Sequence, residues 1–307
     1  MNNETKSAFI AVVGRPNVGK SSFVNAAVGQ KVAIVSDKPQ TTRTRIMGVC
    51  NINEHQLVFV DTPGFHKPRN MLDQYMTKAA QTGLSDVEAA VLVVEAAPKF
   101  RFDPENLPPA ELELIEQFKK RKLPAVLAVN KIDLLEKKED LLQMISAYMS
   151  VFDFSAVVPM SAKNKDGVDI ILNELLKFSK PAPHFFDEDT VTDQPDRVMI
   201  AEIIREKILR TLSDEIPHGT AVIIESCKEK RDKEKNDMIS IRAEIFCERP
   251  SHKPIIIGKN GEMLKKISSM ARADCEKFMG TKVYLTTWVK VKENWRDSDF
   301  MVRNFGY

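Results

Sequence analysis

The stretch Phe9-Ile10-Ala11-Val12-Val13-Gly14-Arg15-Pro16-Asn17-Val18-Gly19-Lys20-Ser21-Ser22 decides the fold class of this chain. Five apolar residues, typical of a buried strand, precede two glycines that are separated by four residues and followed by Lys and Ser. This spacing defines the phosphate-binding loop, in which backbone N–H groups surround an anion at the N-terminus of a helix. The stretch therefore predicts an α/β domain with a doubly wound sheet that binds a nucleoside phosphate.

The side chains of this loop have expected partners in the nucleotide. Lys20 is expected to reach the β- and γ-phosphates, and the Ser21 hydroxyl to ligate Mg²⁺. Kinases, ATPases and GTPases share such a loop, so it leaves the base and the reaction open. The residues that we expect to contact the nucleotide here are Gly14, Arg15, Pro16, Asn17, Val18, Gly19, Lys20, Ser21 and Ser22.

Two further stretches supply candidates for the metal and the γ-phosphate. A polar, turn-rich loop after the first expected helix contains Thr41 and Thr42, and a threonine hydroxyl from it can close over Mg²⁺. We assign this ligand to Thr42, and the sequence leaves Thr41 as the alternative. The tetrapeptide Asp61-Thr62-Pro63-Gly64 follows an alternating strand, at the sheet edge where α/β proteins bind ligands. Asp61 is expected to hold the metal through water, and the Gly64 N–H to meet the γ-phosphate.

The base is expected to bind at Asn130-Lys131-Ile132-Asp133, which follows another apolar run. Guanine presents two adjacent N–H donors that one carboxylate can accept together, whereas adenine has no such pair. Asp133 is therefore expected to select guanine, with Asn130 supporting the ring and Lys131 stacking on it. Ser161-Ala162-Lys163 follows the next strand, and its backbone N–H groups can meet the guanine O6.

Length and composition indicate two domains and no dominant charge. The chain has 307 residues, and single cores usually stop growing at about 250–300 residues. Its 45 Lys+Arg and 43 Asp+Glu give a net charge of +2, which by itself requires neither nucleic acid nor membrane as a partner. No run approaches the roughly 18 apolar residues of a spanning helix, and the polar N-terminus lacks a secretory pattern. We therefore expect a cytoplasmic protein.

The pattern changes in the last third of the chain, where we expect a smaller α+β domain. A helix with apolar residues at 200, 204, 208 and 212 precedes two β-rich runs, two helices and a final strand, in the order α-β-β-α-α-β. We interpret the charged stretch 228–235 as the solvated tip of a hairpin. The expected boundaries are 1–180 for the nucleotide-binding domain, 181–196 for a linker and 197–307 for the second domain.

The tetrapeptide Gly258-Lys259-Asn260-Gly261 lies between the two successive helices of this second domain. The KH fold clamps four nucleotides of single-stranded RNA with a GxxG loop in this position. Eight basic and three acidic residues lie between Ile255 and Lys292. Such lysines can also merely solvate a helix, but their position beside the GxxG loop favours an RNA interface. The candidate RNA contacts are Ile257, Gly258, Lys259, Asn260, Gly261, Lys265 and Lys266.

This combination resembles the Era family of bacterial ribosome-assembly GTPases over nearly the whole chain. The resemblance implies a phosphate-loop GTPase domain followed by a type II KH RNA-binding domain. It rests on 14–22, Gln40-Thr41-Thr42-Arg43, 61–68, 130–133, 161–163, Glu202-Ile203-Ile204-Arg205-Glu206-Lys207, 257–261, 288–292 and Trp295-Arg296.

The resemblance also implies an activity and partners that composition and spacing do not identify. These are Mg²⁺-dependent hydrolysis of GTP to GDP, binding to the 3′ end of 16S rRNA, and assistance in the maturation of the 30S ribosomal subunit. Peripheral association with the inner face of the cell membrane is a further implication, and we expect a monomer.

Three other readings remain open from the sequence. The RNA client can be the large subunit or a tRNA instead. The protein can be an RNA-binding scaffold whose nucleotide site is structural. A phosphate-loop phosphotransferase is also conceivable, but it leaves the stretch from Asn130 to Asp133 unexplained.

Catalysis is expected to need no side-chain base. Signalling GTPases carry a water-orienting Gln directly after the Gly of D-x-x-G, whereas this chain has Phe65, which cannot orient water by hydrogen bonding. We therefore expect Asn17, Lys20, Thr42 and Gly64 to act through positioning and electrostatics. Two roles for Asn17 stay open: it holds a K⁺ near the phosphates, as in similar GTPases, or it only stabilises the turn.

Overall fold

The computed structural model describes residues 4–64, 70–96, 107–135, 138–231 and 237–307. Phe65, the residue that replaces the water-orienting Gln of signalling GTPases, lies outside the described residues. The chain divides into two compact units. The first contains most residues up to Asp193, and the second contains Gln194–Tyr307 together with Ser36–Thr41 and the described part of Pro68–Tyr75.

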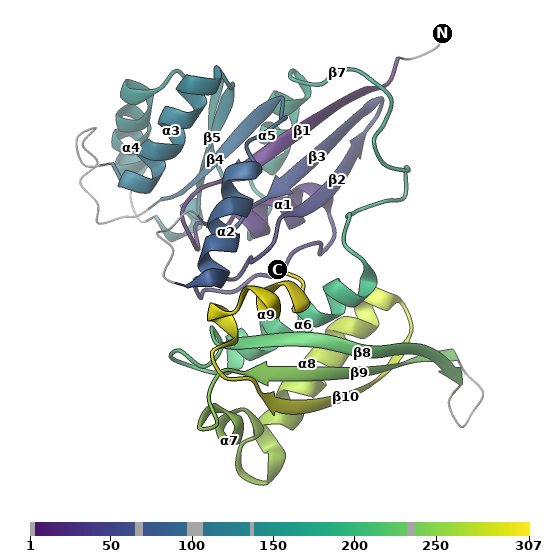
Figure 1. Cartoon of the computed structure of the whole chain (residues 1–307). Coiled ribbons are helices and arrows are strands. Elements are labelled where there is room, and N and C mark those ends of the chain that lie inside the picture. Colours follow the sequence, from purple (N-terminus) through teal and green to yellow (C-terminus); the bar gives the residue numbers. More distant parts are fainter. Residues whose placement is uncertain (1–3, 65–69, 97–106, 136–137, 232–236) are drawn as a thin grey trace. The chain divides into compact units, whose positions relative to one another are not determined.

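The first unit is a largely parallel sheet with helices on both faces (Figure 1). Its strand order is β2-β3-β1-β4-β5-β6, with β7 paired antiparallel to β1. Among the described strands of this path, only β2 runs antiparallel to its neighbour. The strands are β1 (Lys6–Val13), β2 (Ile46–Ile52), β3 (His55–Asp61), β4 (Ala89–Glu95), β5 (Ala125–Asn130), β6 (Ala156–Pro159) and β7 (Lys180–Pro181).

Strands buried on both faces explain the apolar runs of the sequence. In β1, Ile10 and Val12 join the core that contains Phe23, while Ala11 and Val13 join the core that contains Phe118. The doubly wound sheet expected from the phosphate loop is thereby confirmed. The helices of this half are α1 (Lys20–Val28), α2 (Met71–Thr82), α3 (Pro109–Arg121), α4 (Lys138–Val151) and α5 (Val168–Leu176), with a 3₁₀ turn η2 (Ile132–Leu134). The sequence analysis did not identify α4.

The stretch expected as a linker lies along the first unit for most of its length. Pro181 pairs with Lys6 in the sheet, and the Phe185 ring stacks on Phe9 with centroids 4.6 Å apart. Near its end, Thr192 forms an isolated bridge with Gly48. The chain passes from one unit to the other between Asp193 and Gln194.

The second unit has a three-stranded sheet in the order β10-β9-β8. β8 and β9 are antiparallel, whereas β9 and β10 are parallel. With α6, α7 and α8 this is the α-β-β-α-α-β order of a type II KH domain, as expected. Its elements are α6 (Asp196–Thr211), β8 (Thr220–Arg231), β9 (Asp237–Cys247), α7 (His252–Ile257), η3 (Lys259–Gly261), α8 (Glu262–Met279), β10 (Lys282–Val291), η4 (Trp295–Asp297) and α9 (Asp299–Asn304).

One core lies between this sheet and two of its helices. Ile204 of α6 and Ile267, Ala271 and Cys275 of α8 are fully buried against Ile245 of β9. The burial of Ile204 confirms the helix that the apolar spacing at 200, 204, 208 and 212 predicted.

The charged stretch 228–235 differs in part from its interpretation as a hairpin tip. β8 continues to Arg231, which pairs with Asp237, so residues 228–231 belong to the strand. Cross-strand pairing with β9 outweighs the low strand propensity of these lysines and glutamate. Residues 232–236 lie outside the described part of the chain.

Candidate nucleotide and RNA sites

The phosphate loop joins β1 to α1, and its two glycines are required by the backbone. Gly19 precedes α1 with φ +102°, and a Cβ there would lie 2.1 Å from Nδ2 of Asn130. Gly14 has φ +148°, and a Cβ would lie 2.3 Å from the Val93 carbonyl oxygen. Larger residues would therefore clash as well as strain the backbone. The clashing atoms belong to Val93 of β4 and Asn130 of β5, the two strands that follow β1 in the sheet order.

Lys20 is buried at the start of α1 and its ammonium group points back into the loop. Its Nζ donates to the carbonyl oxygens of Gly14 at 3.1 Å and Arg15 at 2.9 Å. Burial lowers the pKa of Lys20 to about 8, opposed by the negative charge of Asp61. A buried cation enclosed by the phosphate loop is suited to bind phosphate oxygens.

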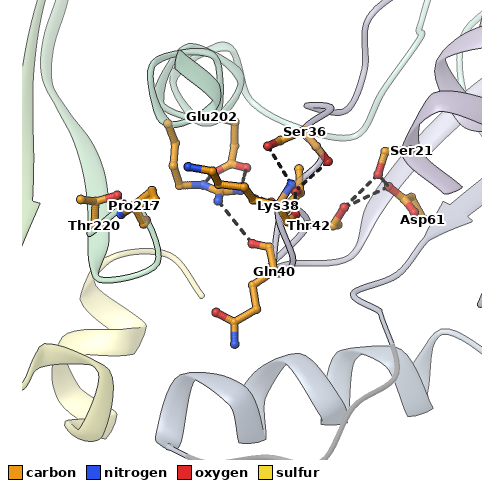
Figure 2. A network of polar contacts seen from close by, with 11 residues as sticks. Ser21, Ser36, Lys38, Gln40, Thr42, Asp61, Glu202, Pro217 and Thr220 are labelled. Atoms are coloured by element: carbon orange, nitrogen blue, oxygen red, sulfur yellow. Dashed lines mark hydrogen bonds and ion pairs between the residues drawn. The ribbon is translucent and has the colours of Figure 1, made fainter. Parts of the chain in front are cut away.

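Three oxygen-bearing side chains from different elements converge beside this lysine, as Figure 2 shows for Ser21, Thr42 and Asp61. The Ser21 hydroxyl donates to Oδ2 of Asp61 at 2.6 Å and lies 2.9 Å from the Thr42 hydroxyl. Thr42 Oγ1 also donates to Oδ2 of Asp61, at 3.5 Å. The structure thus brings together the three residues that the sequence predicted as metal ligands.

The two threonines of the loop have different hydrogen-bond partners. The Thr41 hydroxyl donates to the Lys38 carbonyl oxygen at 2.6 Å, so it is used within its own turn. The position of Thr42 beside Ser21 and Asp61 therefore favours Thr42 as the metal ligand.

Asp61 carries the features of a residue that meets a cation. It is fully buried, and burial raises its pKa to about 6, opposed by Lys20 and by the hydrogen bonds from Ser21 and Thr42. Within the described part of the chain, its Oδ1 atom has no hydrogen-bond partner. A buried carboxylate oxygen of this kind, beside two hydroxyls, fits the oxygen-rich surroundings that Mg²⁺ prefers.

The D-x-x-G stretch lies against the phosphate loop. The Thr62 hydroxyl donates to the Val12 carbonyl oxygen at 3.1 Å. A Cβ on Gly64 would lie 2.7 Å from the backbone nitrogen of Pro16. The Gly64 backbone therefore passes directly beside the loop, where we expect the γ-phosphate.

Asn130 joins the base-binding stretch to the phosphate loop. Its Nδ2 donates to the Val18 carbonyl oxygen at 2.8 Å, and its Oδ1 accepts from the Ala162 N–H at 3.0 Å. Asp133 is exposed and accepts from the Ser161 hydroxyl at 2.6 Å. The structure thus brings three predicted stretches together around one edge of the sheet.

Two of the three backbone N–H groups expected near the guanine O6 have partners within the protein. The Ser161 N–H donates to the Asp166 carbonyl oxygen at 3.0 Å, and the Ala162 N–H donates to Oδ1 of Asn130 at 3.0 Å. These hydrogen bonds hold the turn from Ser161 to Lys163 beside the base-binding stretch.

Sequence reasoning missed two acidic partners of the site. Glu111 of α3 is fully buried, binds Nε of Arg15 at 2.6 Å and accepts from the Tyr148 hydroxyl of α4. Glu95 at the end of β4 binds the Lys131 ammonium at 2.9 Å. The only sequence signal for Glu95 is its position at a strand's carboxyl end, and Glu111 has none because its partners are distant in sequence.

Arg205 of α6 binds the backbone of the segment Ser36–Thr41, and both belong to the second unit. Its guanidinium donates to the Thr41 carbonyl oxygen and, at 3.5 Å, to that of Gln40. It also forms a 2.5 Å ion pair with Glu202, and its side chain is fully buried. Figure 2 shows Glu202 and Gln40 in this network. The sequence analysis quoted this helix for its resemblance but assigned it no role.

The GxxG loop lies between α7 and α8 in a conformation that suits glycine. Gly258 has φ +74°, and a Cβ there would lie 2.6 Å from the Cβ of Met263. Gly261 has φ +78°, and within the described structure no heavy atom beyond its chain neighbours lies within 4 Å of its Cβ position. Lys259 and Asn260 are exposed between them. Space around Gly261 lets a sugar–phosphate backbone approach closely.

Basic side chains continue from the loop into α8. Lys265 and Lys266 are exposed in the second turn of this helix, after the loop that contains Lys259. Ile257, by contrast, is partly buried and packs against the core. The predicted RNA contacts thus lie along one continuous segment.

Comparison with protein families matches both units. Residues 9–131 match a family model described as 50S ribosome-binding GTPase, and residues 215–296 match a KH domain. The chain is 47% identical to GTPase Era of Ruminiclostridium cellulolyticum, covering 98% of this chain and 97% of that protein. It is 46% identical to GTPase Era of Clostridioides difficile, covering 98% of each.

Solved structures agree with these relatives. A single-residue variant of Aquifex aeolicus Era bound to GDP·AlF4⁻ is 36% identical, with a TM-score of 0.90 and coverage of 99% of both chains. An Era structure in complex with MgGDPNP and nucleotides 1506–1542 of 16S ribosomal RNA is 35% identical, with the same TM-score and coverage. Together with the phosphate loop, the base-binding stretch and the GxxG loop, these similarities show that the chain belongs to the Era family of GTPases.

Proposed function

We propose that this GTPase binds the 3′ end of 16S rRNA through its GxxG loop and assists the assembly and maturation of the 30S ribosomal subunit. The observation that carries the proposal is the open left-handed Gly261 between exposed Lys259 and the start of α8. A solved relative that is 35% identical contains nucleotides 1506–1542 of 16S rRNA, which supports this client.

We propose the nucleotide contacts from the geometry of the phosphate loop and the base-binding stretch described above. Lys20 binds the β- and γ-phosphates, and Asp133 accepts from the two guanine donors. Ser21, Thr42 and Asp61 hold Mg²⁺, the last through water, and Mg²⁺ withdraws charge from the phosphates when bound. The backbone N–H of Gly64 binds the γ-phosphate, beside Pro16.

Hydrolysis in this proposal depends on positioning and charge. Asn17 adopts a left-handed conformation with φ 65° within the loop, where its side chain can contribute to a K⁺ site. Equal hydrolysis rates in KCl and NaCl at matched ionic strength would exclude this role and leave Asn17 as a turn residue.

The RNA role is tested with the full chain and a fluorescent oligonucleotide that matches the 3′ end of 16S rRNA. Replacing Lys259 and Asn260 with Asp opposes the RNA backbone through like-charge repulsion, so affinity should fall at least tenfold at low salt. A control that changes the charge equally, Gln117→Asp with Lys120→Asp on α3, should leave affinity unchanged. Parental affinity and salt dependence in the loop variant would refute the RNA-clamp role.

A second client remains a candidate because the matched family model is described as a 50S ribosome-binding GTPase. The large subunit or a tRNA would then compete with the labelled oligonucleotide. Crosslinking followed by sequencing of the bound RNA distinguishes these clients. Recovery of 23S rRNA or tRNA in place of 16S rRNA would reassign the substrate.

We also propose a monomer in the cytoplasm that associates peripherally with the inner face of the cell membrane. No helix within the described residues is long and apolar enough to cross a membrane. Fractionation in the presence of high salt tests peripheral association, because a bound peripheral protein should be released into the supernatant. Gel filtration with light scattering tests the monomer.

A further inference from the structure

One face of the KH sheet is not covered by the helices of its own core. In β10, Val283 and Val289 point into that core, whereas Tyr284 and Trp288 lie on the opposite face with 60% and 42% of their surfaces exposed. α8 packs against the core side of the same strands (Figure 1). We call the opposite side of β8, β9 and β10 the open sheet face.

Strand register gives the neighbours of the two rings. Tyr284 is paired with Ser240 of β9, which is paired in turn with Lys228 of β8. Between the rings, Thr286 is paired with Arg242. The guanidinium carbon of Arg242 lies 5.8 Å from the centroid of the Trp288 ring.

The open sheet face carries more cations than carboxylates around these rings. Glu244, the cross-strand partner of Trp288, is ion-paired with Lys290, so the two charges offset each other. Glu225 lies at the bulge of β8. At one end the C-terminal residues contact the face, where the Phe305 ring lies 4.9 Å from that of Phe246. The basic residues that the register assigns to this face are Lys228, Lys230, Arg242, Lys282 and Lys290.

We propose that the open sheet face is a second RNA-binding surface, on which unpaired bases stack on Tyr284 and Trp288 while the surrounding cations bind phosphates. Exposed aromatic rings on a sheet are the usual platform for single-stranded bases, which offer flat faces of any sequence. A protein partner fits this face less well, because the centres of protein interfaces are depleted in lysine.

This surface is separate from the GxxG loop. The loop joins α7 to α8 on the helix side of the sheet, and α7 packs beside β10. An RNA that reaches both surfaces is therefore expected to pass the edge strand β10. The inference rests on the proposed RNA function and adds a prediction: a short RNA occupies only the loop, whereas a longer one also reaches the open sheet face.

Tryptophan fluorescence provides a direct test. The chain has two tryptophans, and Trp295 is fully buried with Nε1 donating to the Gly219 carbonyl oxygen at 3.0 Å. Stacking of a base should therefore quench the emission of Trp288 alone. A 37-nucleotide RNA from the 3′ end of 16S rRNA should quench the parent, and a 10-nucleotide RNA from its 3′ part should not. Trp288→Phe should remove the quenching and keep the affinity.

Affinity measurements on the same two RNAs test the energetic role. Tyr284→Thr and Trp288→Thr keep a strand-forming residue, and each should weaken binding of the 37-nucleotide RNA about tenfold. Both should leave binding of the 10-nucleotide RNA unchanged. Phe300→Gln is the matched control, because this ring is 70% exposed in α9. Lys228→Gln with Lys282→Gln should reduce the salt slope for the long RNA by about 1.4.

The outcomes separate the two proposals. Unchanged affinity of the Thr variants together with absent quenching would overturn the open sheet face as an RNA site, even if the GxxG loop binds RNA. Loss of ribosome association by variants that still bind both RNAs would make it a protein-docking surface instead. If the Lys259 and Asn260 replacements left the 10-nucleotide RNA bound, the proposed function would fail, and quenching by the long RNA would still report on the sheet.

Discussion

Burial and metal binding favour opposite protonation states of the Asp61 carboxyl group. Burial raises its pKa from 3.8 to about 6, so without metal the folded protein holds a proton more readily than the unfolded chain. This contribution stabilises the metal-free protein below pH 4 and is lost as the pH rises through about 6. A cation reverses the preference, because it binds the deprotonated form.

The pH dependence of Mg²⁺ binding follows from this raised pKa. The Mg²⁺ concentration needed for half-maximal GTP hydrolysis should rise about tenfold for each pH unit below 6, because the proton competes with the metal. Replacing Asp61 with Asn should weaken Mg²⁺ binding at pH 7 and flatten the dependence between pH 5 and 7. A parent profile that is equally flat would contradict a titrating carboxyl at this position.

Base selection is the second prediction for a single residue. Asp133→Asn replaces an acceptor with a donor, so guanine loses its partner and xanthine gains one. The variant should prefer xanthosine triphosphate over GTP in a competition assay, by at least tenfold. Asp153→Asn, at an exposed carboxylate away from the site, is the control. Unchanged preference would disprove the assignment of Asn130 to Asp133 as the base site.

Among the elements, α6 contacts the segment that precedes Thr42, the proposed metal ligand. Arg205 binds the carbonyl oxygens of Gln40 and Thr41, and the next residue is Thr42, whose hydroxyl lies 2.9 Å from that of Ser21. Arg205 therefore holds the backbone of Gln40 and Thr41, whereas the Thr42 side chain contacts Ser21. Any change that releases Arg205 should loosen the backbone next to Thr42.

Replacing Arg205 with Met tests this restraint. Removing one partner of a buried ion pair should cost about 3–5 kcal/mol of unfolding free energy, because Glu202 is left without its cation. Amide hydrogen exchange of residues 36–42 should increase, and the affinity for Mg²⁺ with GTP should decrease. Arg210→Met is the control, since Arg210 lies in the same helix and is half-exposed. If exchange in this segment matched the parent, Arg205 would be only a stabilising residue of the helix.

For the whole molecule, the proposed nucleotide and RNA sites lie in different units. Every residue that we assign to the nucleotide precedes Asp193, and the GxxG loop lies after Gln194. Distant sites without shared partners usually behave independently in binding. The affinity for GTP is therefore expected to be independent of the GxxG loop. We expect bound RNA to act on the rate of GTP hydrolysis, which is slow without a partner.

The Lys259→Asp, Asn260→Asp variant tests this division. It should bind GTP with parental affinity and hydrolyse it at the parental basal rate, but RNA should no longer accelerate the reaction. Single-turnover hydrolysis with and without the 3′-terminal RNA measures both quantities. Circular dichroism must show parental folding, and a folded variant that had lost GTP affinity would contradict the independence of the two sites.

The sequence by itself determined the fold class of both units and indicated the candidate residues of the phosphate and base sites. These features are local: a glycine pattern between a strand and a helix, or a polar tetrapeptide at a strand end, constrains the backbone over a few residues. Only the tertiary structure placed Thr42 beside Ser21 and Asp61, paired Arg15 with Glu111, and set Tyr284 and Trp288 among the cations of the open sheet face. Those relations join residues distant in the chain, so packing and strand register determine them, and neither can be read from spacing along the sequence.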